Sequence, residues 1–108
     1  MLSNVETVQK DGVLTAYLAG EIDHHTAQQL RERLDGEILC AGPAETVLDF
    51  GGVSFMDSSG IGLILGRHKL METLGGTLTV RNTPAQLERI LKLAGVGRVE
   101  SKEGEYAK

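Results

Sequence analysis

Two adjacent serines lie where an apolar strand gives way to a helix, in the sequence Phe-Met-Asp-Ser-Ser-Gly-Ile-Gly at residues 55–62. Asp and Ser are residue types that cap helix N-termini, because their side-chain oxygens accept hydrogen bonds from backbone N–H groups that lack partners within the helix. The same N–H groups and the helix dipole favour a bound anion. An exposed hydroxyl at this turn can therefore be a helix cap only, or an acceptor for a phosphoryl group. The local chemistry leaves both interpretations open for Ser58 and Ser59.

Phosphorylation at this turn predicts an off-switch that does not require unfolding. A phosphoryl group adds about −1.5 to −2 charge. It would lie beside Asp57, and near Asp23 if the two turns lie on one edge of the protein. The helix N-terminus stabilises such a charge by ~0.3–1 kcal/mol, so the modified domain stays folded. A partner that docks against this acidic edge would instead meet a bulky dianion.

A serine hydrolase is the alternative among enzymes. Its serine needs a histidine base within hydrogen-bond reach and an acid that orients the base. Three histidines are available, but the motif Gly-x-Ser-x-Gly is absent. We expect His24 and His25 to be surface residues in the first turn of a helix, and His68 to lie against the core. The expectation is therefore that this protein is not an enzyme.

Metal and nucleotide motifs are missing from the sequence. Adjacent histidines on a helix diverge by roughly 100°, there is no His-x-x-x-His pair, and Cys40 is the only cysteine. We therefore expect no metal site and no internal disulfide. The phosphate-loop motif Gly-x-x-x-x-Gly-Lys-Ser/Thr is also absent despite fourteen glycines. No cofactor is expected, and direct nucleotide binding stays an open question at this stage.

The length and charge of the chain restrict the class of partner. With 108 residues, we expect a single domain over 1–108. Eleven basic and fifteen acidic residues give a net charge of −4, with no Lys/Arg block, which argues against nucleic acid and favours a basic protein surface. No signal-peptide pattern occurs at the N-terminus, and no apolar run approaches the ~18 residues that span a bilayer. We expect a cytoplasmic monomer that does not bind membranes.

The hydrophobic pattern predicts an α/β fold with a mixed β-sheet. A strand pair at 5–8 and 13–18, joined by Asp11-Gly12, opens the chain. Gly20 and Gly51-Gly52 are expected to end their strands. A hairpin followed by alternating helices and strands implies parallel pairing after the hairpin, with the helices packed on the sheet. The further expected elements are a helix capped by Asp23 and ending near Leu39, a strand at 46–50, a helix from Asp57 to Gly75-Gly76, a strand at 77–80, a helix opened by a capping box at 83–86 and ending at Gly95, a strand at 98–101 and a polar tail at 103–108.

Apolar stripes on the three expected helices predict the core. We expect the central helix to be buried on more than one side, because its apolar residues cover much of its girth. Gly62 and Gly66 lie one turn apart on this helix, at a cost in helix propensity of ~1 kcal/mol each. Tight helix–sheet packing and contact with a partner both explain them. The stripes consist of Ala27, Leu30, Leu34 and Ile38; of Ile61, Leu63, Ile64, Leu65, Leu70, Met71 and Leu74; and of Leu87, Ile90, Leu91 and Ala94.

The segment at 55–62, together with Gly-Glu-Ile-Asp at 20–23, resembles the STAS-domain family. Within that family the resemblance is greatest to the anti-sigma factor antagonists, particularly those of the sporulation sigma F pathway. The longer run at 54–65, followed by Gly66-Arg67, makes the match specific. The resemblance covers nearly the whole chain and is weakest after Gly97, where the family's usual C-terminal helix looks shortened or missing.

The resemblance implies a regulatory switch. Unphosphorylated, such a protein binds an ATP-bound anti-sigma factor that is also a serine kinase, and thereby releases the sigma factor and promotes sporulation transcription. The kinase phosphorylates the first serine of the turn, here Ser58, and the product dissociates. A PP2C-type phosphatase restores the active form. A STAS module of a general stress sigma pathway, with the same chemistry and another kinase, is the alternative.

The resemblance also assigns a partner-binding surface around Ser58. Glu21 and Asp23 would meet basic groups of the kinase. Asp57 would cap the turn and border the site, while the residues at 60–62 would allow close approach of the partner. The expected partner-binding residues are Glu21, Asp23, His24, Asp57, Ser59, Gly60, Ile61 and Gly62.

Overall fold

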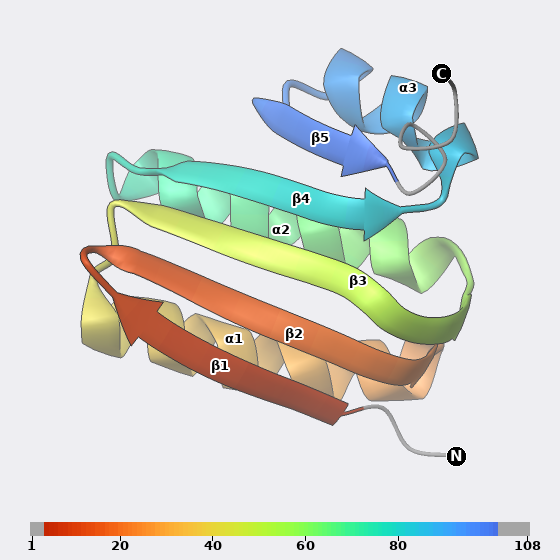
Figure 1. Ribbon diagram of the computed structural model, residues 1–108, viewed down its shortest axis with the longest axis horizontal. Coiled ribbons are helices and arrows are strands. Elements are labelled where there is room, and N and C mark those ends of the chain that lie inside the picture. The colour runs from red at the N-terminus through yellow and green to blue at the C-terminus, as the bar shows by residue number, and fades with distance from the viewer. Residues whose placement is uncertain (1–3, 102–108) are drawn as a thin grey trace.

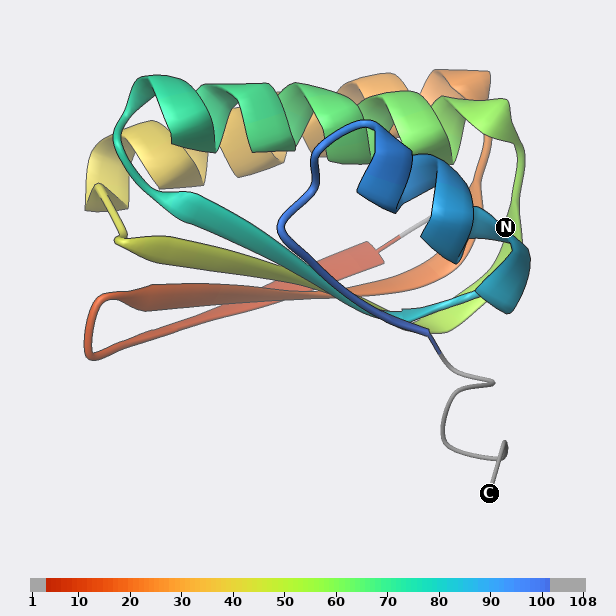
Figure 2. The same cartoon turned by 90° about the horizontal axis from the view of Figure 1, so that it is seen from above.

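The structure, a computed structural model, describes residues 4–101. Within this range five strands form one mixed sheet in the order β1-β2-β3-β4-β5, in which β1 and β2 are antiparallel and the other neighbours are parallel (Figure 1). All three helices cover the same face of the sheet (Figure 2). The predicted α/β fold is confirmed. The elements are β1 (Asn4–Lys10), β2 (Val13–Ile22), α1 (His24–Ala41), β3 (Glu45–Met56), α2 (Ser58–Thr73), β4 (Thr77–Thr83), α3 (Ala85–Leu93) and β5 (Arg98–Ser101).

The opening hairpin turns at the predicted position. Asp11 and Gly12 have φ values of 54° and 80°, and two successive residues with positive φ are the signature of the type I′ turn that suits the twist of a hairpin. Because side chains alternate along a strand, Leu14, Ala16 and Leu18 share the face that packs under the helices, where all three are buried.

β2 and β3 are both longer than the sequence predicts. The expectation that Gly20 and Gly51-Gly52 end these strands is wrong. Gly20 has a φ of 88° and lies at a register shift between β2 and β3, so it forms a bulge within the strand rather than a break. A Cβ on Gly52 would lie 3.0 Å from the Cβ of Ala19. Glycine is therefore favoured there, because a side chain would crowd the backbone of the neighbouring strand.

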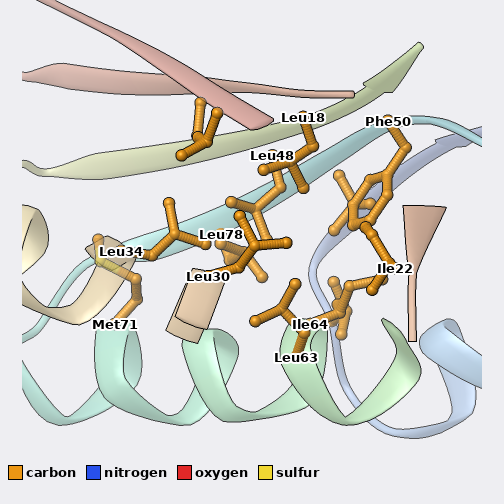
Figure 3. Packing of buried hydrophobic residues seen from close by; sticks show 14 of the residues in the cluster. Leu18, Ile22, Leu30, Leu34, Leu48, Phe50, Leu63, Ile64, Met71 and Leu78 are labelled. Atoms are coloured by element: carbon orange, nitrogen blue, oxygen red, sulfur yellow. The ribbon is translucent and has the colours of Figure 1, made fainter. Parts of the chain in front are cut away.

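The core lies between the sheet and the helices (Figure 3). The predicted stripe of α1 is confirmed, since all its residues are at most 9% exposed. On α2 both stripes contact the core, except that Leu74 is 48% exposed at the helix C-cap. Complete burial of one such Leu, Ile or Phe side chain contributes about 1.5–3 kcal/mol. The labelled core residues in Figure 3 are Leu18, Ile22, Leu30, Leu34, Leu48, Phe50, Leu63, Ile64, Met71 and Leu78.

An ion pair joins the two long helices. Nε of Arg67 on α2 lies 2.8 Å from Oδ1 of Asp35 on α1, and the Arg67 side chain is only 6% exposed. The contact between Nε of Arg67 and Oδ1 of Asp35 does not have the geometry of a hydrogen bond. Nη1 of Arg67 also has no hydrogen-bond partner among the described residues. Burial lowers the pKa of the Arg67 guanidinium from its ordinary value, and the carboxylate of Asp35 opposes this effect. The guanidinium still stays charged at neutral pH.

The start of α3 differs from the prediction. Thr83 is the last residue of β4, where it pairs with Ser101, so it cannot serve as the N-cap of a capping box. Pro84 occupies the N-cap without a side-chain hydrogen bond, and the buried hydroxyl of Thr83 has no hydrogen-bond partner within residues 4–101. Strand pairing has overridden the local capping signal.

The burial of α3 is also less than predicted. Leu91 is buried, whereas Ile90 is 47% exposed and Ala94 is exposed. α3 is a short helix that packs mainly against β5 (Figures 1 and 2), so only a narrow stripe is covered. The helix stops before Gly95, which has a φ of 92°, and β5 follows as predicted. The predicted tail at 103–108 and the C-terminal helix of the family lie outside the described residues.

Across residues 4–101, no helix combines the length and the apolar character that crossing a membrane requires.

Candidate functional site

The ends of β2 and β3 bring two acidic helix caps to one edge of the protein. Ile22 pairs with Met56 in the parallel register, and the N–H of Asp57 donates to the carbonyl of Ile22 over 3.1 Å. Asp23 and Asp57, the next residues on each strand, are the N-caps of α1 and α2. The two turns therefore lie side by side, at the right-hand end of β2 and β3 in Figure 1. We call the segments 21–24 and 57–62 together the acidic edge.

Ser58 is an exposed residue whose hydroxyl is not needed to cap α2. Oδ1 of Asp57 accepts the hydrogen bond from the N–H of Ser59 at 2.8 Å, so Asp57 is the cap. Ser58 follows as the first residue of the helix, and its hydroxyl forms no hydrogen bond within the described chain. The interpretation that one of the serines only caps the helix is wrong. The Ser58 hydroxyl is accessible to a partner.

Asp23 is held by a reciprocal capping box. Its Oδ1 accepts from the N–H groups of His25 and Thr26 at 3.0 and 2.9 Å, and its own N–H donates to Oγ1 of Thr26 at 2.9 Å. The Thr26 hydroxyl also donates a hydrogen bond to the carbonyl of Glu21 at 3.0 Å. The first turn of α1 is thus fixed to the end of β2. Thr26 was not predicted as part of this cap, although Asp-x-x-Thr before an apolar stripe was a usable signal.

The hydrogen bonds to Asp23 predict how the stability contribution of its carboxylate depends on pH. They lower the pKa of this carboxyl, chiefly through the backbone N–H of Thr26. A group with a lowered folded-state pKa stabilises the protein above its unfolded pKa of about 3.9. That contribution is lost as the pH falls through the folded value. The stability difference between wild type and Asp23→Asn should therefore shrink as the pH falls below about 4. Urea unfolding of both proteins at pH 7 and pH 3 measures it, and an unchanged difference would contradict the assignment.

Packing inside the protein explains why residue 60 is a glycine. Gly60 is buried, and a Cβ there would collide with Sδ and Cγ of Met56. The side chain of Met56 therefore fills the space under the turn. In contrast, a Cβ on Gly62 or Gly66 would have no neighbouring side chain or backbone of another segment within 4 Å in the described structure. Tight helix–sheet packing is thus the wrong explanation for Gly62 and Gly66, and contact with a partner stays a prediction.

These contacts predict opposite stability effects for two substitutions on one helix. Gly60→Ala should destabilise the protein by about 1–3 kcal/mol, because Met56 must move. Gly62→Ala should leave stability unchanged or raise it by up to ~1 kcal/mol, because alanine favours the helix. Urea unfolding curves of the two variants check this. Equal destabilisation by both would show that the described packing at Gly60 is not the cause.

A hollow of about 230 Å³ lies between α1 and α2 and is lined by Ser59. Its lining includes His24 of α1 and both Ser59 and Gly62 of α2, which are three of the predicted partner-binding residues. The hollow also contains Arg31, which was not predicted as a site residue and which forms no ion pair within residues 4–101. Arg31 lies two turns into α1, and nothing in the local sequence distinguishes it from an ordinary surface arginine. Ile61 is partly buried against the core instead.

The serine-hydrolase and metal-site alternatives can both be compared with the geometry of the described residues. Within 4–101, no hydrogen bond connects a histidine to Ser58 or Ser59. His24 and His25 are exposed, as predicted, while His68 is largely buried with its Nε2 3.7 Å from a carboxylate oxygen of Glu72. The same part of the chain contains no group of three or more His, Cys, Asp or Glu side chains that could hold a metal ion.

The family model described as "STAS domain" matches residues 4–105. The protein therefore belongs to the STAS domain family. Its sequence is 37% identical over 95 residues to the "Anti-sigma F factor antagonist" of Paenibacillus polymyxa, covering 88% of this chain and 81% of the relative. It is 33% identical over 93 residues to the "Anti-sigma-B factor antagonist" of Bacillus subtilis (strain 168), covering 86% and 84%. The resemblance to anti-sigma factor antagonists that the motifs predict is confirmed.

Solved structures show the same fold. The unphosphorylated anti-sigma factor antagonist SpoIIAA superposes with a TM-score of 0.75 at 27% identity, covering 95% of this chain and 94% of that chain. The phosphorylated form of the Bacillus cell fate determinant SpoIIAA gives 0.73, again at 27% identity, covering 95% and 96%. These relatives are regulatory proteins that are known in two phosphorylation states.

Proposed function

We propose that this protein is an anti-sigma factor antagonist, which in its unphosphorylated form binds an anti-sigma factor and releases the sigma factor. The names of its relatives in two sigma pathways support this function. The observation that carries the proposal is the position of Ser58, exposed at the start of α2 and relieved of capping by Asp57. A hydroxyl in this position is open to modification without any change of fold.

The proposed partner is an ATP-bound anti-sigma factor that is also a serine kinase. Its catalytic groups would remove the proton from the Ser58 hydroxyl as Oγ forms a bond to the γ-phosphorus of ATP, and ADP would leave. A PP2C-type phosphatase would hydrolyse the resulting phosphoserine to serine and inorganic phosphate. The protein itself would supply a substrate hydroxyl and a docking surface, and it would not be an enzyme.

The exposed position of Ser58 within the acidic edge supports phosphorylation as the signal for release. Glu21, Asp23 and Asp57 place three carboxylates on the acidic edge. The sequence contains no lysine, arginine or histidine between 45 and 66. A basic surface of the kinase would match this edge before the reaction. After it, a phosphoryl group of about −2 charge would occupy space and disturb the close contact there, while remaining compatible with the start of α2.

The sporulation sigma F pathway is our first proposal for the pathway, because a relative of that name is 37% identical. A general stress pathway is the second candidate, because a sigma-B relative is 33% identical over nearly the same length. In both cases we propose that the protein acts in the cytoplasm as a monomer. Glu21, Asp23, His24, Asp57, Ser59, Gly60, Ile61 and Gly62 would form or support the contact surface.

Phosphate transfer with purified kinases tests this function. The wild-type protein, Ser58→Ala and the matched control Ser59→Ala are each incubated with ATP and a sporulation or stress anti-sigma kinase. Mass spectrometry then locates the phosphate. We expect phosphate on Ser58 in the wild type and in Ser59→Ala, and none in Ser58→Ala. Hydrolysis of an ester substrate that is lost in Ser58→Ala would favour a hydrolase instead. The kinase that reacts faster identifies the pathway.

A further inference from the structure

Beside the acidic edge, β3 and β4 separate and leave an opening. Their parallel pairing ends where Asp49 lies opposite Arg81. β3 then continues to Met56 with only β2 as its neighbour, whereas the pairing of β4 with β5 has a register shift at Asn82, which has a φ of 60°. The opening lies at the carboxyl-terminal end of the paired segments of β3 and β4.

This opening is a small apolar pocket. Its volume is about 200 Å³, and its lining consists of Phe50 and residues 53–56 of β3, together with Asn82 and Pro84. We call it the Phe55 pocket, because Phe55 lines it and is 54% exposed. Pockets for drug-sized ligands measure about 300–1,000 Å³. The Phe55 pocket is therefore too small for a nucleotide, and its size suits an apolar side chain from another protein.

The wall formed by Asn82 is held in place before any partner arrives. Positive φ is unusual for a residue with a side chain, and here Nδ2 of Asn82 donates to Oδ1 of Asp49 at 3.0 Å. The same Oδ1 accepts from the N–H of Gly51 at 2.8 Å, and Oδ2 lies 3.4 Å from Arg81. Asp49 thus ties both sides of the opening together. A preformed wall lowers the ordering cost of binding.

The pocket is continuous with the acidic edge. Phe55 lies two residues before Asp57 and opposite Glu21 in the β2–β3 register. A partner that covers Ser58 would therefore reach the pocket, and its residues around the apolar side chain would face carboxylates. The segment 45–66 provides no cation to repel a basic partner. Aromatic residues, including phenylalanine, are also enriched at protein–protein interfaces relative to the rest of the protein surface.

We propose that the Phe55 pocket receives an apolar side chain, flanked by lysine or arginine, from the anti-sigma factor that docks on Ser58. This inference rests on the proposed function and names the chemistry of the partner at that site. Phe55 would supply apolar affinity and the carboxylates of the acidic edge would orient the partner. Ser58 would remain the phosphate acceptor.

Isothermal titration with the anti-sigma kinase and a non-hydrolysable ATP analogue tests the apolar contact. We expect Phe55→Ala to bind at least about tenfold more weakly, a loss of about 1.4 kcal/mol. The matched control is Leu39→Ala, since Leu39 is 62% exposed near the opposite end of α1, and it should bind within about twofold of wild type. Wild-type affinity for Phe55→Ala overturns the inference and leaves the proposed function intact. Failure of the wild type to bind any anti-sigma factor overturns both.

Two substitutions of opposite charge at Ser54 test whether lysine or arginine of the partner lies beside the pocket, and they leave the ring of Phe55 in place. Ser54 lines the pocket and is exposed. Ser54→Lys should weaken binding and Ser54→Glu should not, and the ratio of their affinities should be largest at low salt. Both variants should unfold in urea near the wild-type midpoint. A salt-independent ratio close to one would contradict the basic flank.

Discussion

Ser58→Asp is expected to keep the free energy of unfolding close to that of the wild type while weakening anti-sigma factor binding by at least about tenfold, or 1.4 kcal/mol. The fold should tolerate the change because Ser58 is exposed at the first position of α2, where a negative charge interacts favourably with the helix dipole. Binding should suffer because the new carboxylate lies next to Asp57, where a partner must approach closely.

Urea unfolding and isothermal titration of the same preparations measure the two quantities. Ser58→Asn is the matched control, since its side chain has nearly the size of aspartate without the charge, and it should bind more tightly than Ser58→Asp. Aspartate carries less charge than phosphoserine, so the Ser58→Asp effect is a lower bound for that of phosphorylation. Unchanged affinity for Ser58→Asp, with normal binding by the wild type, would count against charge as the cause of release.

Asp35→Asn is expected to destabilise the protein by about 3 kcal/mol, at the lower end of the range for breaking a buried ion pair. The reason is that the nearly buried guanidinium of Arg67 loses its only carboxylate partner in the described chain, whereas Asp35 itself is 34% exposed. Arg67→Met should cost less than about 1.5 kcal/mol, because methionine fills a similar volume without a charge and water can reach Asp35. Urea unfolding measures both.

The double variant Asp35→Asn with Arg67→Met separates loss of charge from loss of packing. Removal of both partners eliminates the unpaired buried charge, so the double variant should recover most of the stability that Asp35→Asn loses. Strictly additive destabilisation in the double variant would show that the pair contributes through packing alone. Because the pair joins α1 to α2, it also fixes the distance between the helices that carry Asp23 and Ser58.

Local chemistry in the sequence was sufficient to predict the N-caps of α1 and α2 and most elements. Asp23 and Asp57 cap their helices because short acidic side chains satisfy free N–H groups wherever a strand passes into an apolar helix. Asp11-Gly12 marks a hairpin for an equally local reason, the positive φ of both residues. The exposure of Ser58 follows from the same logic, because Asp57 already performs the capping.

The features that the sequence did not predict depend on neighbours that are distant along the chain. Gly52 looks like a strand break, but it is a point where β3 contacts Ala19 of β2. Thr83 looks like a helix cap, but strand pairing with Ser101 keeps it in β4. The approach of Arg67 to Asp35 requires the crossing of two helices, for which a single sequence gives no signal. The Phe55 pocket likewise arises only where β3 and β4 separate.

Displacement of the sigma factor tests the central claim most directly. A complex of fluorescent sigma factor and its anti-sigma kinase is mixed with this protein, either unphosphorylated or fully phosphorylated on Ser58, and free sigma factor is followed by fluorescence anisotropy. We expect the unphosphorylated protein to release the sigma factor and the phosphorylated protein to release almost none over the same concentration range. Equal release by both forms, or none by the unphosphorylated one, would contradict the account.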